Sequence, residues 1–263
     1  MIDININIED IKKVAIEAGK KILEVYGTDD FQVETKGDDS PLTVADRMSH
    51  EVIVAGLEKL DLGFPILSEE GDPGDFEARK NWPVFWCVDP LDGTKEFVKR
   101  NGEFTVNIAL IDGKYPVMGV IYVPVTDTTY FSDSNGAYMQ VGNAAPQKLQ
   151  VQGREKDLVG VGSRSHSSEA EQQVMEMFGV TDTISRGSSL KFCMVAEGKA
   201  DIYFRKNPTM EWDTAAGQAI IEGSGGVVLN KDNERFHYNK AVLRNDSFLC
   251  LAYKGTDKPW FKA

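Results

Sequence analysis

Cysteine, histidine and positive charge are scarce in this 263-residue sequence. Cys87, Cys193 and Cys250 each lie in apolar sequence without a Cys-x-x-Cys spacing, which favours reduced core thiols over disulfides or a zinc site. The three histidines have no motif context that would support a Ser/His/Asp triad. Asp and Glu outnumber Lys and Arg by 41 to 29, and the formal net charge of -12 argues against a nucleic-acid-binding surface.

Long apolar runs and nucleotide-binding fingerprints are also missing. Residues 1–10 alternate Ile with Asp and Asn and lack the basic and apolar regions of a signal peptide. With no membrane-spanning segment visible, we expect a cytoplasmic protein. Neither a Gly-x-Gly-x-x-Gly fingerprint nor a Walker loop is present, which weakens dinucleotide and nucleoside-triphosphate interpretations. The length allows one large domain or two smaller ones that share an interface.

Residues 1–145 have the pattern of an α+β part. Apolar spacing predicts helices over residues 8–25 and 44–57, and residues 43–46 have the spacing of a capping box. Asp112-Gly113-Lys114 predicts a hairpin turn. Strands are expected over residues 65–68, 84–88, 104–111, 117–123, 129–131 and 137–141. We therefore expect two helices against a mostly antiparallel sheet.

Residues 146–263 alternate strands and helices, which predicts an α/β part that forms one compact unit with the first. The expected strands are residues 158–162, 200–204, 227–229 and 248–253. The expected helices are residues 170–178, 190–197 and 212–221.

Acidic residues occur where predicted strands end. Asp89 and Asp92 lie in a turn that Pro90 and Gly93 break out of the strand at residues 84–88. Two such carboxylates and a backbone carbonyl can converge on Mg²⁺, and glycine lets backbone N–H groups approach a phosphate. The alternative is an ordinary surface turn, because Asp, Pro and Gly are common turn residues.

Three further carboxylates are ambiguous when taken singly. Glu69 follows the predicted strand at residues 65–68, which precedes the strand at residues 84–88 in the chain. If these two strands are neighbours in the sheet, they could bring Glu69, Asp89 and Asp92 to one edge. Asp46 and Asp213 stand at predicted helix starts, where a capping role would also explain them.

Taken jointly, three motifs resemble the signature set of the lithium-sensitive, Mg²⁺-dependent inositol monophosphatase superfamily, in order and in spacing. They are Glu69-Glu70, Asp89-Pro90-Leu91-Asp92-Gly93-Thr94 and Trp212-Asp213-Thr214-Ala215-Ala216-Gly217. Within the superfamily, four further segments resemble the CysQ-type 3'(2'),5'-bisphosphate nucleotidases. These segments are residues 95–97, 101–111, 163–166 and 187–192. The resemblance implies a layered α-β-α-β-α sandwich of the sugar-phosphatase type. It also implies removal of the 3'-phosphate from adenosine 3',5'-bisphosphate, a by-product of sulfate assimilation, to give AMP.

The resemblance further implies a role for each site residue. Two or three Mg²⁺ ions would be held by Glu69, Asp89, Asp92, Asp213 and the Leu91 carbonyl. Of these residues, all except Asp89 would also contact the substrate. Asp46 would orient Thr94, whose hydroxyl would position the attacking water, and the N–H groups of Gly93 and Thr94 would hold the scissile phosphate. The nucleotide and its second phosphate would be held by Lys191, Ser163, His166 and Ser188 or Ser189.

Two alternatives stay open. One is a phosphatase for inositol monophosphate or a related sugar phosphate of the same superfamily, because substrate choice depends on variable loops. The other is a non-catalytic regulator that binds a nucleotide. The expected partner is a small-molecule substrate, with no nucleic acid and no integral membrane segment. The sequence leaves open a peripheral association with the inner membrane, and the choice between monomer and homodimer.

Overall fold

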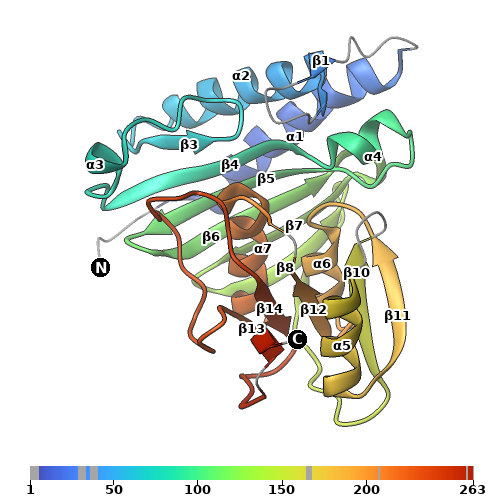
Figure 1. Ribbon diagram of the computed structural model, residues 1–263. Helices are drawn as coiled ribbons and strands as arrows, with labels where there is room; N and C mark the ends of the chain where they lie inside the picture. The colour runs from blue at the N-terminus through green and yellow to red at the C-terminus, as the bar shows by residue number, and fades with distance from the viewer. Residues whose placement is uncertain are drawn as a thin grey trace.

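Helices and sheets alternate in five layers in the computed structural model, which describes residues 6–28, 34–35, 41–163, 168–206, 208–258 and 260–262 (Figure 1). Helices α1 (Ile8–Tyr26) and α2 (Val44–Glu58) cover one face of a seven-stranded sheet. On its other face lie α7 (Glu211–Gly223) and α6 (Leu190–Ala196), which also contact a five-stranded sheet. Helix α5 (Glu169–Phe178) packs on that second sheet. The expected α-β-α-β-α sandwich is confirmed.

The seven-stranded sheet is antiparallel except at one edge, where β3 (Ile66–Ser68) runs parallel to β4 (Val84–Asp92). Its order is β3-β4-β5-β6-β7-β8-β9. The remaining strands are β5 (Thr105–Asp112), β6 (Tyr115–Val123), β7 (Thr128–Asp133), β8 (Gly136–Val141) and β9 (Gln147–Leu149). Because β9 still pairs with β8, this sheet extends a few residues beyond the division proposed after residue 145. A separate pair joins β1 (Glu34–Thr35) to β2 (Pro41–Leu42).

The five-stranded sheet is mixed, in the order β11-β10-β12-β14-β13. Strand β10 runs parallel to β11 and β12, whereas β14 runs antiparallel to β12 and β13. The strands are β10 (Leu158–Ser163), β11 (Val180–Arg186), β12 (Ile202–Arg205), β13 (Val227–Leu229) and β14 (Phe248–Leu251). Strand β11 was not predicted, because this edge strand is largely exposed and has no alternation of apolar residues.

Side-chain alternation along β4 decides which way the acidic residues point. Trp86 and Val88 pack in the cluster formed with α1 and α2, whereas Phe85 and Cys87 pack in the cluster formed with α6 and α7. Since side chains alternate between the two faces of a strand, Asp89 points toward α6 and α7. The sheet therefore presents this carboxylate to the layer between the two sheets.

Two expectations around β4 are corrected. The strand does not stop at Val88 but continues past Pro90 to Asp92, because a β-bulge accommodates the proline. The charged sequence of residues 95–103 predicts an exposed stretch, but helix α4 (Thr94–Val98) forms here, and its Glu96 and Phe97 are buried. Such one-turn helices are too short to show an apolar period. The other short elements are α3 (Phe76–Arg79), η1 (Pro124–Thr126) and η2 (Trp260–Lys262).

Cys87, Cys193 and Cys250 are all buried and free, as the sequence predicted. In the described part of the chain, no helix combines the length and apolarity needed to cross a bilayer.

Candidate metal centre and active site

A β-bulge places Asp89 and Asp92 on the same face of the first sheet. Asp89 pairs with Asn107 and Asp92 pairs with Thr105, so three steps along β4 match two steps along β5. In a regular strand, residues three apart point to opposite faces, and the extra residue of the bulge cancels that reversal. The turn foreseen in the sequence is therefore a bulge that turns two carboxylates toward one point.

Glu69 and Asp213 complete this acidic cluster from two other elements. Glu69 directly follows β3, and its N–H donates to the Val88 carbonyl at 3.1 Å, which places it beside Asp89. Asp213 lies in the first turn of α7, where its Oδ2 accepts from the Met210 N–H at 2.9 Å. Asp213 thus caps its helix while it faces the first sheet.

The four carboxylates lie within one another's electric field. Burial raises the pKa of Asp89 well above its usual range, and the charges of Glu69, Asp92 and Asp213 raise it further. Burial likewise raises the pKa of Asp213, with Asp92 and Glu69 adding to the shift. Such a cluster favours the uptake of protons or of a cation.

The donor set fits Mg²⁺ by its chemistry. Carboxylates and a backbone carbonyl, here that of Leu91, are the hard oxygen ligands that this ion prefers. As placed, no three His, Cys, Asp or Glu side chains among the described residues form a ready-made metal cage. The fit therefore rests on the type of donor and on the mutual repulsion that a divalent cation would relieve.

The structure brings Asp46 and Thr94 together. The Thr94 hydroxyl lies 3.2 Å from Asp46 Oδ1 and 3.3 Å from the Leu91 carbonyl oxygen. The other carboxylate oxygen of Asp46 accepts from the N–H of Thr43 at 2.8 Å and from its hydroxyl at 2.6 Å, which closes the capping box of α2. Asp46 is buried, and the same side chain both caps α2 and contacts Thr94.

One face of α2 also holds the ends of β3 and β4. Ser49 donates to the Pro90 carbonyl at 2.7 Å, and His50 Nδ1 lies 2.9 Å from Ser68 Oγ. Asp46, Ser49 and His50 are three and four residues apart, so they share a helix face. Sequence reasoning missed Ser49 and His50, because only their helical spacing from Asp46 could have indicated them.

Gly93 sits where two turns approach closely. Its φ of +92° lies in the left-handed region, and an added Cβ would come within 3.0 Å of the Glu103 carbonyl oxygen and 3.1 Å of Ser188 Cβ. The Glu103 carboxylate accepts from the Gly187 N–H at 2.7 Å. The turn after Asp92 and the turn before α6 are therefore packed against each other around Glu103.

The neighbours Ser188 and Ser189 have different surroundings. The Ser189 hydroxyl lies 2.7 Å from Asp92 Oδ2 and 2.9 Å from the Asp213 carbonyl oxygen, and it accepts from Asn107 Nδ2 at 2.9 Å. The Ser188 hydroxyl is buried and has no hydrogen-bond partner among the described residues. Of the two alternatives left open by the sequence, Ser188 has the hydroxyl free for a ligand.

A cavity of about 140 Å³ adjoins the acidic cluster. Lys191 lines it, and burial lowers the pKa of this amine to about 8, although the charge of Asp92 opposes the shift. Arg205, at the end of β12, also lines it, and its buried Nε and Nη1 have no hydrogen-bond partner within the described ranges. Sequence reasoning missed Arg205, which lies at the end of an apolar strand without a motif. The cavity is also lined by Asp92, Gly93, Ser163, Ser188, Ser189 and Asp213.

His166 lies in residues 164–167, outside the described residues. Every other candidate site residue lies at the acidic cluster, at the Asp46 and Thr94 contact or along the cavity.

The fold agrees with the comparisons to known proteins. The model of the inositol monophosphatase family matches residues 7–257, and the chain belongs to this family. Within it, the chain is similar to the 3'(2'),5'-bisphosphate nucleotidase CysQ of Escherichia coli strain K12, with 46% identity over 94% of this chain and 98% of the relative. The sequence-based resemblance is thereby confirmed.

Two solved structures are similar to this chain in fold and in sequence. The crystal structure of CysQ from Bacteroides thetaiotaomicron, described as a bacterial member of the inositol monophosphatase family, is 43% identical with a TM-score of 0.83. It covers 94% of this chain and 97% of its own. The extragenic suppressor protein suhB from Bartonella henselae is 26% identical with a TM-score of 0.75, over 97% of this chain and 95% of its own.

Proposed function

We propose that this protein is a Mg²⁺-dependent phosphatase that removes the 3'-phosphate of adenosine 3',5'-bisphosphate, giving AMP and inorganic phosphate. The observation that carries the proposal is a pair of cations, the buried Lys191 and the partly buried Arg205, in a cavity beside a cluster of four carboxylates. A substrate with two phosphates matches both regions. The relatives named 3'(2'),5'-bisphosphate nucleotidase support the same choice.

The acidic cluster would hold two or three Mg²⁺ ions through Glu69, Asp89, Asp92, Asp213 and the Leu91 carbonyl. Bound Mg²⁺ would neutralise phosphate charge and lower the pKa of a water molecule. It would also overcome the unfavourable net charge of the chain for an anionic substrate.

Asp46 and Thr94 would orient the attacking water. The Thr94 hydroxyl donates toward Asp46 at 3.2 Å, so an oxygen lone pair is left to accept a hydrogen bond from water. The N–H groups of Gly93 and Thr94 would hold the scissile phosphate, because glycine leaves room for its approach. Phosphoryl transfer depends mainly on positioning and charge neutralisation, which these groups can supply.

Lys191 and Arg205 would hold the second phosphate. Charge-assisted hydrogen bonds to phosphate are strong, and a guanidinium whose buried Nε and Nη1 have no partner among the described residues has the most to gain from such a ligand. Ser163 and Ser188 line the same cavity and would add neutral hydrogen bonds, with His166 as a further candidate. Ser189, whose hydroxyl is already engaged, would orient Asp92 instead.

The test is phosphate release with Mg²⁺ from adenosine 3',5'-bisphosphate and from inositol 1-phosphate, for the wild type, Asp92→Ala and Lys191→Met. We expect the wild type to prefer the nucleotide, Asp92→Ala to be inactive on both substrates, and Lys191→Met to lose the preference. A preference of the wild type for inositol 1-phosphate would favour a sugar-phosphate phosphatase of the same family. Tight nucleotide binding without phosphate release would favour a regulator. The cytoplasmic location, and the choice of monomer or homodimer, stay predictions.

A further inference from the structure

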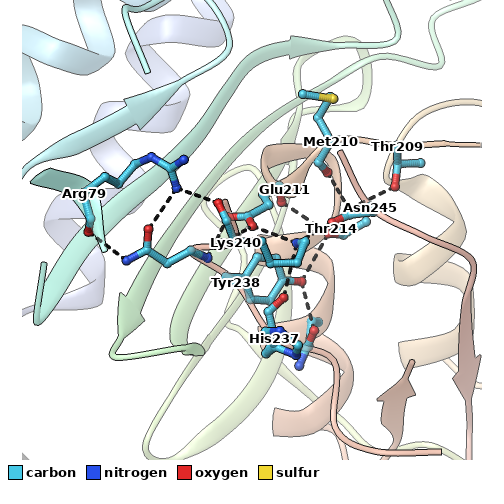
Figure 2. A network of polar contacts seen from close by, with 11 residues as sticks. Arg79, Thr209, Met210, Glu211, Thr214, His237, Tyr238, Lys240 and Asn245 are labelled. Carbon is cyan, nitrogen blue, oxygen red and sulfur yellow. Dashed lines mark hydrogen bonds and ion pairs between the residues drawn. The ribbon is translucent and has the colours of Figure 1, made fainter. Parts of the chain in front are cut away.

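A buried ion pair stands at the start of α7, outside the candidate active site. Glu211 is fully buried and precedes Asp213 by two residues. Its Oε1 accepts from Lys240 Nζ at 2.7 Å and from the Lys240 N–H at 2.9 Å, and its Oε2 accepts from the Asn239 N–H at 2.8 Å. Figure 2 shows Lys240 and Glu211 at the centre of a wider polar network.

A stabilising role alone does not explain this pair. Removing two charges from water costs several kcal/mol per ion, and well-packed apolar residues often serve stability as well or better. The network is better explained by what it holds in place.

Asn245 extends the network to the residues that precede Asp213. Its Nδ2 donates to the Met210 carbonyl at 2.7 Å, and its own N–H donates to the Thr209 carbonyl at 2.7 Å. Lys240 Nζ donates to Asn245 Oδ1 at 2.9 Å, so the ion pair and the amide hold each other. Met210 is the residue whose N–H binds the Asp213 carboxylate. The contacts therefore fix the backbone that sets the direction of Asp213.

Arg79 connects the same network to the segment between β3 and β4 of the seven-stranded sheet. This buried side chain, at the end of α3, donates from Nη1 to Asn239 Oδ1 at 2.9 Å and to the Lys240 carbonyl at 3.0 Å. Asn239 Nδ2 donates back to the Arg79 carbonyl at 2.9 Å. Because α3 lies between β3 and β4, the network joins the segment that follows Glu69 to the segment that precedes Asp213 (Figure 2).

We propose that Glu211, Lys240 and Asn245 are positioning residues that hold Asp213 at the distance and angle at which it completes the metal centre of Glu69, Asp89 and Asp92. The proposal rests on the proposed function, because it takes Asp213 as a metal ligand. These residues act through the backbone of α7 and touch neither metal nor substrate.

The test compares Asn245→Ala and Glu211→Gln with Glu222→Gln, a control at the other end of α7. Glu222 pairs with Arg235 at 2.6 Å, so the control also removes one ion-paired carboxylate from this helix, but about 16 Å further along it. The readout is the dissociation constant for Mn²⁺ as a Mg²⁺ probe, measured by electron paramagnetic resonance. It is taken at a temperature where circular dichroism shows each variant to be folded.

We expect Asn245→Ala and Glu211→Gln to bind Mn²⁺ about tenfold or more weakly than the wild type, the change expected for losing one good hydrogen bond at the site. Glu222→Gln should bind within about twofold of the wild type, since additivity holds for distant sites. If Glu211→Gln does not fold, Asn245→Ala carries the test, because it removes only a neutral amide. Wild-type Mn²⁺ affinity in folded Asn245→Ala, with only a lower melting temperature, would overturn the proposal.

A parallel Asp213→Asn variant separates this inference from the proposed function. If Asp213→Asn binds Mn²⁺ as tightly as the wild type, the metal role of Asp213 is wrong and the positioning role is wrong with it. If Asp213→Asn loses affinity but Asn245→Ala does not, the metal centre stands and only the positioning role is wrong.

Discussion

Replacing Ser189 and Ser188 separately by Ala should affect two different properties of the enzyme. Ser189→Ala removes the hydroxyl that lies 2.7 Å from Asp92 Oδ2 and 2.9 Å from the Asp213 carbonyl oxygen, which come from the two sides of the candidate metal centre. Asn107 Nδ2 loses one acceptor at 2.9 Å but keeps Asp92 Oδ2 at 3.3 Å. A hydrogen bond to a charged acceptor contributes about 1.5–3 kcal/mol.

That range corresponds to a loss of about 10- to 150-fold in kcat/KM or in Mg²⁺ affinity. Ser188→Ala removes a hydroxyl without a partner in the described part of the chain, so it should raise KM for the bisphosphate by a few-fold, with the Mg²⁺ dependence unchanged. The assay is phosphate release over a matrix of Mg²⁺ and substrate concentrations. Wild-type Mg²⁺ dependence in Ser189→Ala, or a changed Mg²⁺ dependence in Ser188→Ala, would refute the assignment of the two hydroxyls.

Three further predictions concern backbone geometry, substrate charge and metal binding. Gly93→Ala should lose stability by about 1–2 kcal/mol from its left-handed φ, plus about 1–3 kcal/mol from overpacking against Glu103. Gly63 also has a positive φ, but an added Cβ there would have nothing within 4 Å, so Gly63→Ala is the control. Equal losses in the free energy of unfolding for the two variants, measured with denaturant, would contradict the overpacking at Gly93. KM for adenosine 3',5'-bisphosphate should rise above about pH 8, because Lys191 loses its charge as pH passes its lowered pKa; adenosine 3'-monophosphate, without the second phosphate, should show no such rise. Mg²⁺ should raise the melting temperature more at pH 7.5 than at pH 5.5. The pKa values of Asp89 and Asp213 are higher in the folded protein than in the unfolded chain, so the metal-free protein loses stability as pH rises from the unfolded pKa toward the folded pKa. Mg²⁺ bound to the ionised carboxylates would offset that loss of stability. An equal rise in melting temperature with Mg²⁺ at the two pH values would contradict this prediction.

The long elements of the fold were predictable because their local signals are strong. Apolar period and capping residues locate α1 and α2 almost to the residue, and the Gly113 turn places β5 beside β6. Strand β11 and helix α4 were missed because an exposed edge strand and a single helical turn have no such period. Their positions depend on pairing with distant segments.

For the candidate site, motif residues were predictable and their supports were not. Asp89 and Asp92 stand out as carboxylates in a short Pro- and Gly-containing turn, but the bulge that aligns them depends on the register with β5. Asn107 meets Asp92 only after β5 pairs with β4, and Ser189 reaches Asp92 only when the start of α6 packs against this sheet. Asn245 and Lys240 are ordinary polar residues in sequence, and only tertiary contacts bring them to the start of α7.

The most direct test of the proposed activity is the identity of the nucleotide product. Phosphorus NMR of a reaction with adenosine 3',5'-bisphosphate, Mg²⁺ and the wild-type protein distinguishes the two monophosphates. We predict adenosine 5'-monophosphate and inorganic phosphate in equal amounts, because in the proposed function the acidic cluster acts on the 3'-phosphate while Lys191 and Arg205 hold the 5'-phosphate. Formation of adenosine 3'-monophosphate, or no release of phosphate at saturating Mg²⁺, would contradict it.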